Sequence, residues 1–182
     1  PAIERIGWEP REGERDLDKP LRGALISALG VLGADPQAYA LAMEIERESR
    51  GDGQVDPSLA AASVGIVAAG GPAEDYERVL EATKAARTPQ EELRYLYALP
   101  DFRDDVLVDR TTNMTLTPDI RAQNVPGVLA RAMANRDHGG LAWSFVKDHW
   151  DEIVAKVAPT TLVYVADGIR FLRASEAGWG SG

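Results

Sequence analysis

The sequence predicts an all-α fold built from antiparallel helical hairpins, and two regularities support this prediction. Apolar residues recur at intervals of three and four within blocks of about 10 to 15 residues, as in helices that bury one face. Most of these blocks begin at a proline or at a residue type that caps helices. The strict alternation of apolar and polar residues that indicates a strand is scarce.

The first two helices are expected over residues 21–32 and from residue 36 to about residue 50. In the first, the spacing predicts one buried stripe, which consists of Leu21, Ala24, Leu25, Ala28, Leu29 and Leu32. Gly33 is expected to end this helix. Proline is well placed at position 36, because N–H groups in the first turn of a helix have no helical partner. A polar loop over residues 49–54 should follow.

The next two helices are expected over residues 57–69 and 73–86. The first of them contains so much alanine and glycine that another helix must pack very close to it. Gly70-Gly71-Pro72 should end it. The second places Tyr76, Val79 and Leu80 on one face.

The fifth helix has the clearest start signal in the chain. Thr88 is expected as its N-cap, Pro89 in its first turn and Glu91 three residues after the cap, which is the capping-box pattern. The sixth helix is expected to begin at Asp101 or Asp104.

The sixth helix is expected to end before Pro118, and further helices are expected over residues 125–135, 141–157 and 160–172. Residues 160–165 also satisfy a strand pattern, but we interpret them as helical.

The short loops between these helices predict consecutive antiparallel hairpins. Thr88-Pro89 and Thr117-Pro118 lie 29 residues apart, which is one hairpin per step and a weak repeat. We therefore expect a short HEAT/armadillo-like α-solenoid, with a compact irregular helical bundle as the alternative. A single domain is expected over residues 1–174, with residues 1–18 as a lead-in and residues 175–182 as a flexible tail.

Composition excludes several classes of protein. The chain has 182 residues, of which 45% are hydrophobic and 27% charged, and this balance is that of a globular domain. The net charge of −9 disfavours nucleic acid and anionic lipid as partners. No apolar run reaches the roughly 18 residues of a membrane span, so no membrane association is expected. The absence of cysteine fits a reducing compartment, and a cytoplasmic location is expected.

No catalytic or metal-binding constellation is evident. His138 and His149 lie eleven residues apart and lack the His-Glu-x-x-His spacing of zinc hydrolases, so no metal site is predicted and both are expected at helix ends or on the surface. No Gly-x-Ser-x-Gly or phosphate loop occurs. The acidic pairs at residues 74–75, 91–92 and 104–105 fall near helix starts, where the helix dipole favours them.

Two segments contain residues that could have a functional role in addition to packing. Residues 120–124 place a guanidinium, an amide and an N-capping asparagine between two helices, in Arg121, Gln123 and Asn124. Arg121 could bind a peptide carboxylate or a neighbouring domain, or it could tie down loop carbonyls of adjacent hairpins. In residues 141–150, Trp143, Val146 and Trp150 share a helix face, which indicates core first and a ligand platform second.

These two segments resemble the carboxy-terminal helical domain of zinc aminopeptidases of the aminopeptidase N, puromycin-sensitive and endoplasmic-reticulum types. That family has Ile/Val-Arg-x-Gln-Asp-Val, a helix ending in Asn, a Gly, then Leu-Ala-Trp-x-Phe-Val/Leu-Lys and an Asn-Trp. The matching residues here are Ile120-Arg121-Ala122-Gln123-Asn124-Val125, Asn135, Gly140 and the run Leu141 to Trp150, which includes Trp143 and Phe145. Weaker similarity extends the resemblance over residues 7–172. Asn124 stands where Asp is usual and His149 where Asn is usual, so an Arg–Asp clamp cannot be carried over intact.

The resemblance implies an accessory domain that is excised from a longer chain and inactive alone. The zinc and its ligands would belong to an upstream catalytic domain of the same polypeptide, and this chain would carry no cofactor. The domain would close the peptide chamber and contact the far end of the peptide substrate, with Arg121, Gln123 and Asn124 as contact candidates. Asn135, Trp143, Phe145 and Trp150 would be structural members of the family motif. Self-association of the excised domain is also expected. The alternative is a free-standing helical-repeat adaptor that binds a protein segment on its concave face.

Overall fold

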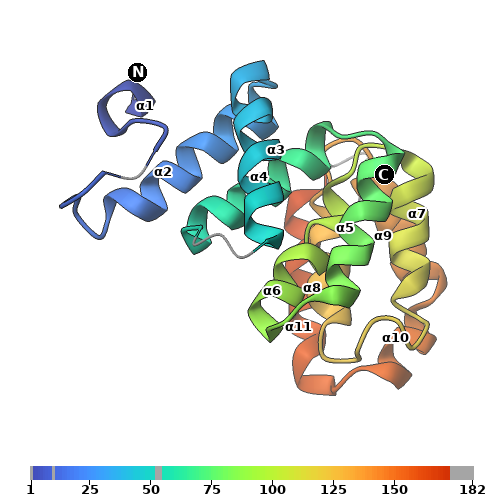
Figure 1. Ribbon diagram of the computed structural model, residues 1–182. Helices are drawn as coiled ribbons and strands as arrows, with labels where there is room; N and C mark the ends of the chain where they lie inside the picture. Colours follow the sequence, from blue (N-terminus) through green and yellow to red (C-terminus); the bar gives the residue numbers. More distant parts are fainter. Residues whose placement is uncertain (1, 10, 52–54, 173–182) are drawn as a thin grey trace. The chain divides into compact units, whose positions relative to one another are not determined.

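The structure is a computed structural model that describes residues 2–9, 11–51 and 55–172 (Figure 1). Every regular element in these ranges is helical, and no β-strand occurs among them. The predicted all-α, α-solenoid-like class is therefore confirmed. The chain forms two compact units, residues 1–95 and 96–182. A single domain over residues 1–174 stays a prediction, and the tail predicted over residues 175–182 lies outside the described residues.

The first unit is built around one helix, α4, that is apolar on almost all sides. The elements of this unit are α1 (Ala2–Ile6), α2 (Asp18–Ser27) with a π-helical turn over Ala28–Leu32, α3 (Pro36–Arg50), α4 (Pro57–Gly70), α5 (Ala73–Ala85) and α6 (Pro89–Leu96). Helix α4 packs against both α2 and α3. A Cβ atom on Gly30 would lie 2.6 Å from the Ile66 side chain, so the predicted close approach to the alanine-rich helix is confirmed.

The predicted stripe of the first helix is correct only in part, because Leu25 and Leu29 pack against the core while the fully buried face of α2 is a different one. Leu21 and Leu32 are 46% and 70% exposed, whereas Arg22, Gly23 and Ile26 form the buried face of α2. Two contacts explain the difference. The Arg22 side chain is satisfied by an ion pair with Glu14, and Gly23 allows the backbone of Ser58 to approach closely.

The helix starts in this unit follow the predicted caps. The Oδ1 atom of Asp35 accepts from the N–H groups of Gln37 and Ala38 at 2.9 Å, and Asp56 caps α4 in the same way. At α6, Thr88 Oγ1 accepts from the Glu91 N–H at 3.1 Å. The Glu91 carboxylate accepts from the N–H of Arg87, one residue before the position that the capping box predicts.

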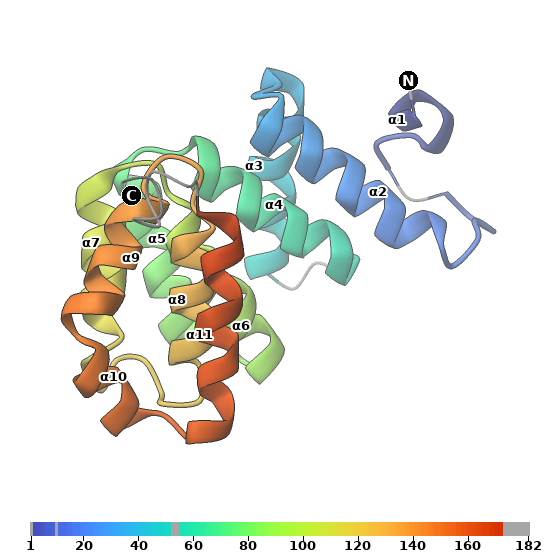
Figure 2. The same ribbon diagram turned by 180° about the vertical axis from the view of Figure 1, so that it is seen from behind.

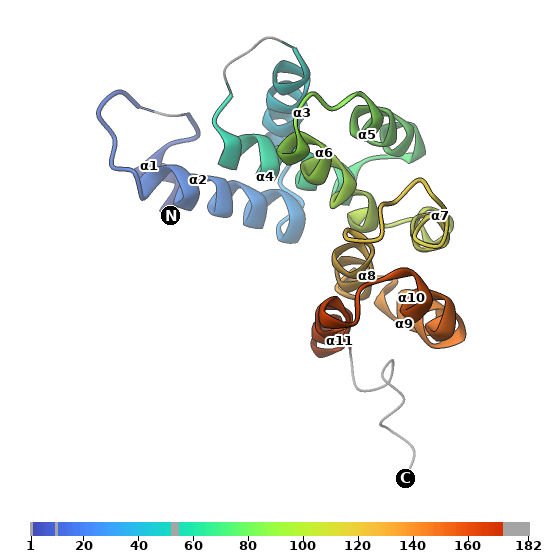
Figure 3. The ribbon, with the colours of Figure 1, turned by 90° about the horizontal axis from the view of Figure 1, so that it is seen from below.

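The second unit places α8 between its other helices (Figures 2 and 3). Its elements are a 3₁₀ turn over Leu99–Asp101, α7 (Asp105–Met114), α8 (Val125–Met133), α9 (Gly139–Asp148), α10 (Trp150–Lys156), a 3₁₀ turn over Pro159–Thr161, α11 (Leu162–Gly168) and a 3₁₀ turn over Ile169–Phe171. Helix α8 contacts α7, α9 and α11, and Val128, Leu129 and Ala132 on it are fully buried. Of the two predicted starts of α7, Asp104 is the N-cap.

The prediction of one helix over residues 141–157 is wrong, because the structure has two helices there. The backbone leaves helical geometry at His149, with φ −113° and ψ 20°, so that this residue ends α9 and starts α10. The ring centroids of His149 and Phe145 lie 4.6 Å apart, and the Nδ1 atom of His149 lies 2.8 Å from Glu152 Oε1. The segment over residues 160–172 is helical as predicted.

Candidate functional site

The loop that joins α7 to α8, residues 115–124, carries the predicted contact residues. We call it the α7–α8 loop. Helix α7 reaches it without a glycine, and threonines satisfy its last carbonyl groups instead. Thr115 Oγ1 donates to Thr112 O at 2.6 Å, and Thr117 Oγ1 donates to Met114 O at 3.1 Å. Backbone N–H groups of residues 115–117 add bonds to the carbonyls three residues earlier.

Lys156, in the last turn of α10, holds the start of this loop. Its ammonium donates to Thr115 O at 2.6 Å and to Thr117 O at 2.5 Å. Burial lowers the pKa of Lys156, while the nearby Asp119 carboxylate acts in the opposite direction. Sequence reasoning missed this residue, and the available signal was a threonine-rich helix end that lacks a C-cap glycine.

The middle and the end of the loop are fixed as well. Ile120 is 1% exposed, and the Asn124 N–H donates to Arg121 O at 2.8 Å, which closes a tight turn. Arg121 and Gln123 are both exposed. The turn therefore presents these two polar side chains at the surface on a backbone that is anchored on both sides.

Asn124 does not share that surface, because it is only 6% exposed. It occupies the N-cap position of α8 in helical backbone geometry, but its side chain makes no capping hydrogen bond. Its expected role as a side-chain cap is therefore wrong. The structure brings Arg121 and Gln123 to the surface and leaves Asn124 inside.

Asn135 ties two parts of the second unit together with its side-chain amide. The Nδ2 atom donates to Pro100 O and Phe102 O, both at 2.8 Å. The Oδ1 atom accepts from the N–H groups of Asp137 and His138 at 3.0 and 2.9 Å. These four bonds join the turn after α8 to the segment before α7, which gives Asn135 a structural part in the fold.

The two tryptophans of the motif line an apolar hollow of about 380 Å³ between the α9–α10 segment and α11. Its lining residues are Trp143, Val146, Lys147, Trp150, Val165, Ala166 and Ile169. Trp150 is 43% exposed, so the expectation that it belongs to the core is wrong. The break at His149 accounts for this, because Trp150 starts α10 and does not continue the helical geometry of α9. Phe145 is buried as a core residue.

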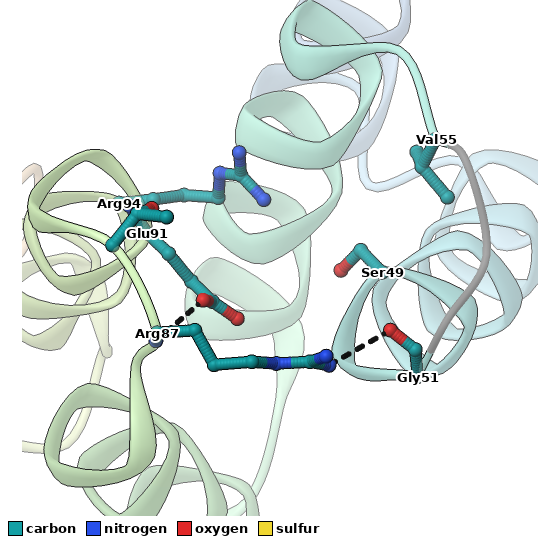
Figure 4. Close-up of a pocket in the computed structure, with 7 residues that line it drawn as sticks. Ser49, Gly51, Val55, Arg87, Glu91 and Arg94 are labelled. Atoms are coloured by element: carbon teal, nitrogen blue, oxygen red, sulfur yellow. Dashed lines mark hydrogen bonds between the residues drawn. The ribbon is translucent and has the colours of Figure 1, made fainter.

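A second hollow, of about 320 Å³, lies in the first unit (Figure 4). It is lined by Ser49, Gly51, Val55, Arg87, Thr88, Glu91 and Arg94. The Arg87 guanidinium donates to the carbonyls of Arg50 and Gly51 at 3.0 Å and so caps the end of α3. Glu91 is engaged by the Arg87 backbone. These charged groups therefore stabilise helix ends.

The histidines lie where the sequence predicts them, at helix ends. His138 is the residue before α9, and its Nε2 atom lies 2.9 Å from Arg103 O. Within the described ranges, no group of three or more His, Cys, Asp and Glu side chains is placed to hold a metal ion. In the same ranges, no helix combines the length and the hydropathy that a membrane span requires.

Comparison with known proteins agrees with the resemblance seen in the sequence. A family model described as the ERAP1-like C-terminal domain matches residues 1–170. Aminopeptidase M1-A of Oryza sativa subsp. japonica is 32% identical over 184 residues, which cover 98% of this chain and 21% of the relative. Aminopeptidase M1 of Arabidopsis thaliana is 26% identical over 84% of this chain and 18% of the relative. The alanine/arginine aminopeptidase of Saccharomyces cerevisiae is 24% identical over 86% of this chain and 18% of the relative.

The chain thus spans about a fifth of the length of the curated relatives that it matches. The match of the family model extends over nearly all described helices, including both segments that carry the motif. The chain belongs to the family of the ERAP1-like C-terminal domain, the C-terminal domain of M1 family aminopeptidases.

Proposed function

We propose that this chain is the accessory domain of a zinc metallo-aminopeptidase, where it closes the peptide chamber over a catalytic domain and contacts the distal end of the peptide. Its relatives are named as aminopeptidases, and this supports the proposed aminopeptidase reaction. The zinc ion would belong to the catalytic domain. The two histidines of this chain lie at separate helix ends and, with no cysteine present, do not form a zinc donor set.

The observation that carries the proposal is the presentation of Arg121 and Gln123 on an anchored turn. A connector that only links two helices has no need of an exposed guanidinium on an anchored backbone. Arginine offers a rigid fork of donors that matches a carboxylate in a bidentate way. An exposed Arg121 on an anchored turn, with an amide two residues away, is therefore suited to the carboxylate of a peptide's far end.

A further feature supports contact with another part of a longer protein. Large apolar side chains are exposed on α10 and α11, namely Trp150, Val154, Val163 and Tyr164. Exposed apolar side chains that form one contiguous patch commonly mark an interaction surface. The domain in isolation should self-associate through these side chains.

The experiment compares two proteins from the same gene, the upstream region alone and the upstream region joined to residues 1–182. Rates are measured on short and long peptides. The proposal predicts that the joined chain is a zinc-dependent aminopeptidase whose preference for peptide length depends on this domain. Arg121→Ala should lower kcat/KM for long peptides. Arg136→Ala, at an exposed arginine after α8, is the matched control.

Equal rates for both proteins on all peptides would contradict the proposal. The absence of an upstream peptidase in the gene would contradict it as well. In either case the adaptor alternative takes its place, in which the helical repeats bind a protein segment without any peptidase.

A further inference from the structure

Two carbonyl groups in the loop after α7, those of Thr115 and Thr117, accept hydrogen bonds from a donor outside the loop. A helix leaves its last four carbonyl groups without helical partners, and a C-cap glycine usually allows the chain to turn back and satisfy them. Here the residues after α7 are Thr115, Leu116, Thr117 and Pro118. Their N–H and hydroxyl groups satisfy the carbonyls of residues 112–114, whereas the carbonyls of Thr115 and Thr117 accept from a side chain of another helix.

Lys156 supplies the missing donors from a position 41 residues away in the chain. One ammonium group bonds both carbonyls, at 2.6 and 2.5 Å. Its positive charge also lies at the carboxyl end of α7, where the helix dipole favours a cation. The Lys156 side chain is partly buried, so these bonds to a charged donor replace water.

The position of Lys156 depends on the break at His149. A continuous helix would carry Lys156 onward along the axis of α9, whereas the non-helical backbone of His149 makes α10 a separate helix with Lys156 in its last turn. Figure 2 shows the α7–α8 loop running past α10. His149 is thus linked through α10 and Lys156 to the start of the loop that carries Arg121.

We propose that Lys156 is a positioning residue, which fixes the α7–α8 loop so that Arg121 and Gln123 are held in the orientation that meets the peptide. This inference rests on the proposed function for its consequence in catalysis. The positioning itself rests on the two hydrogen bonds and on the anchored turn that follows them. Its effect should therefore be visible in the loop as well as in the reaction.

The experiment uses the joined aminopeptidase chain with Lys156→Met, which keeps most of the side-chain length and removes the charge, and with Lys156→Arg, which restores donors. Lys84→Met is the control, because Lys84 is an exposed lysine in the last turn of α5. The first readout is hydrogen exchange of the Asn124 N–H, which bonds to Arg121 O. We expect about tenfold faster exchange in Lys156→Met, with amides of α8 unchanged.

The second readout is steady-state kinetics on long and short peptides. In Lys156→Met we expect a higher KM for long peptides, an unchanged kcat and unchanged short-peptide rates, with recovery in Lys156→Arg. The KM effect should be absent when Arg121 is already alanine, because both substitutions then remove the same contact. Circular dichroism confirms that each variant is folded, and Lys156→Arg provides the comparison if Lys156→Met is not.

The two readouts separate this inference from the proposed function. Unchanged exchange of the Asn124 N–H in folded Lys156→Met would overturn the positioning role. Faster exchange with no effect of Arg121→Ala on any peptide would support the positioning and contradict the proposed function. Additive KM effects of the two substitutions would overturn the link between Lys156 and Arg121.

Discussion

Arg22 and Glu14 form a buried ion pair in the first unit, with side chains only 1% and 6% exposed. The guanidinium binds the carboxylate through two nitrogens, of which Nη1 lies 3.1 Å from Oε1, and its Nε atom donates to Gly7 O at 3.2 Å. These contacts fasten the segment that precedes α2 to the buried face of that helix. The pair is therefore a structural element of the first unit.

Arg22→Met should destabilise the first unit. The substitution keeps the apolar stem but leaves the Glu14 carboxylate in a buried place without its partner, which costs more than the pair itself contributes. We expect the melting temperature to fall by several degrees. Arg15→Met is the control, because the Arg15 side chain is 83% exposed in its pair with Asp18. Equal effects of the two substitutions would contradict the account.

The same pair predicts how stability depends on pH. The hydrogen bond from Arg22 is the main reason that the pKa of Glu14 lies below its ordinary value of 4.5. A carboxyl with a lower pKa in the folded state stabilises the fold above its unfolded pKa, and this stabilisation is lost as pH falls through the folded pKa. Urea unfolding from pH 6 to pH 3 should show this loss, and Glu14→Gln should show a shallower dependence.

Asn135→Ala should destabilise the second unit by about 3 kcal/mol, because buried carbonyl and N–H groups lose their partners. The four bonds of its amide connect segments on both sides of it. Asn113→Ala, at an exposed asparagine of α7, should cost less than about 0.5 kcal/mol. Chemical denaturation measures both values. A cost for Asn135→Ala as small as that of the control would show that the amide is not needed.

The aromatic residues of the motif should differ in their contribution to stability. Phe145 is 7% exposed, and its truncation to alanine should cost about 3 to 5 kcal/mol. Trp150 is 43% exposed, and its truncation should cost clearly less. Denaturation curves of the two variants test this order. The reverse order would indicate that Trp150 is a core residue and would contradict its exposed position at the start of α10.

Local sequence signals predicted several helix starts, but not the break at His149. Thr88 caps α6 as expected, and Asp35 and Asp56, which are of a residue type that caps helices, cap α3 and α4, because a cap depends on groups within three residues of it. The buried face of α2 was predicted wrongly. An arginine enters the interior there, and this depends on Glu14, which the periodicity of α2 does not include.

The candidate site was predictable in part, because part of it is visible in the local sequence. The polar residues of the α7–α8 loop, which a simple connector does not need, indicated Arg121 and Gln123 as candidates, and both are exposed. The inward position of Asn124 depends on tertiary packing, and the contact of Lys156 with Thr115 joins residues 41 positions apart. No spacing rule within one helix contains that information.

The central claim is that Arg121 meets the far end of the peptide, and one cycle of four rates tests it directly. The joined aminopeptidase with Arg121 or with Arg121→Ala is assayed on a long peptide that ends in a free carboxylate or in an amide. If Arg121 binds the carboxylate, amidation should lower kcat/KM about tenfold or more with Arg121 present. Amidation should then have little effect in Arg121→Ala. An equal effect of amidation with and without the arginine would contradict the account.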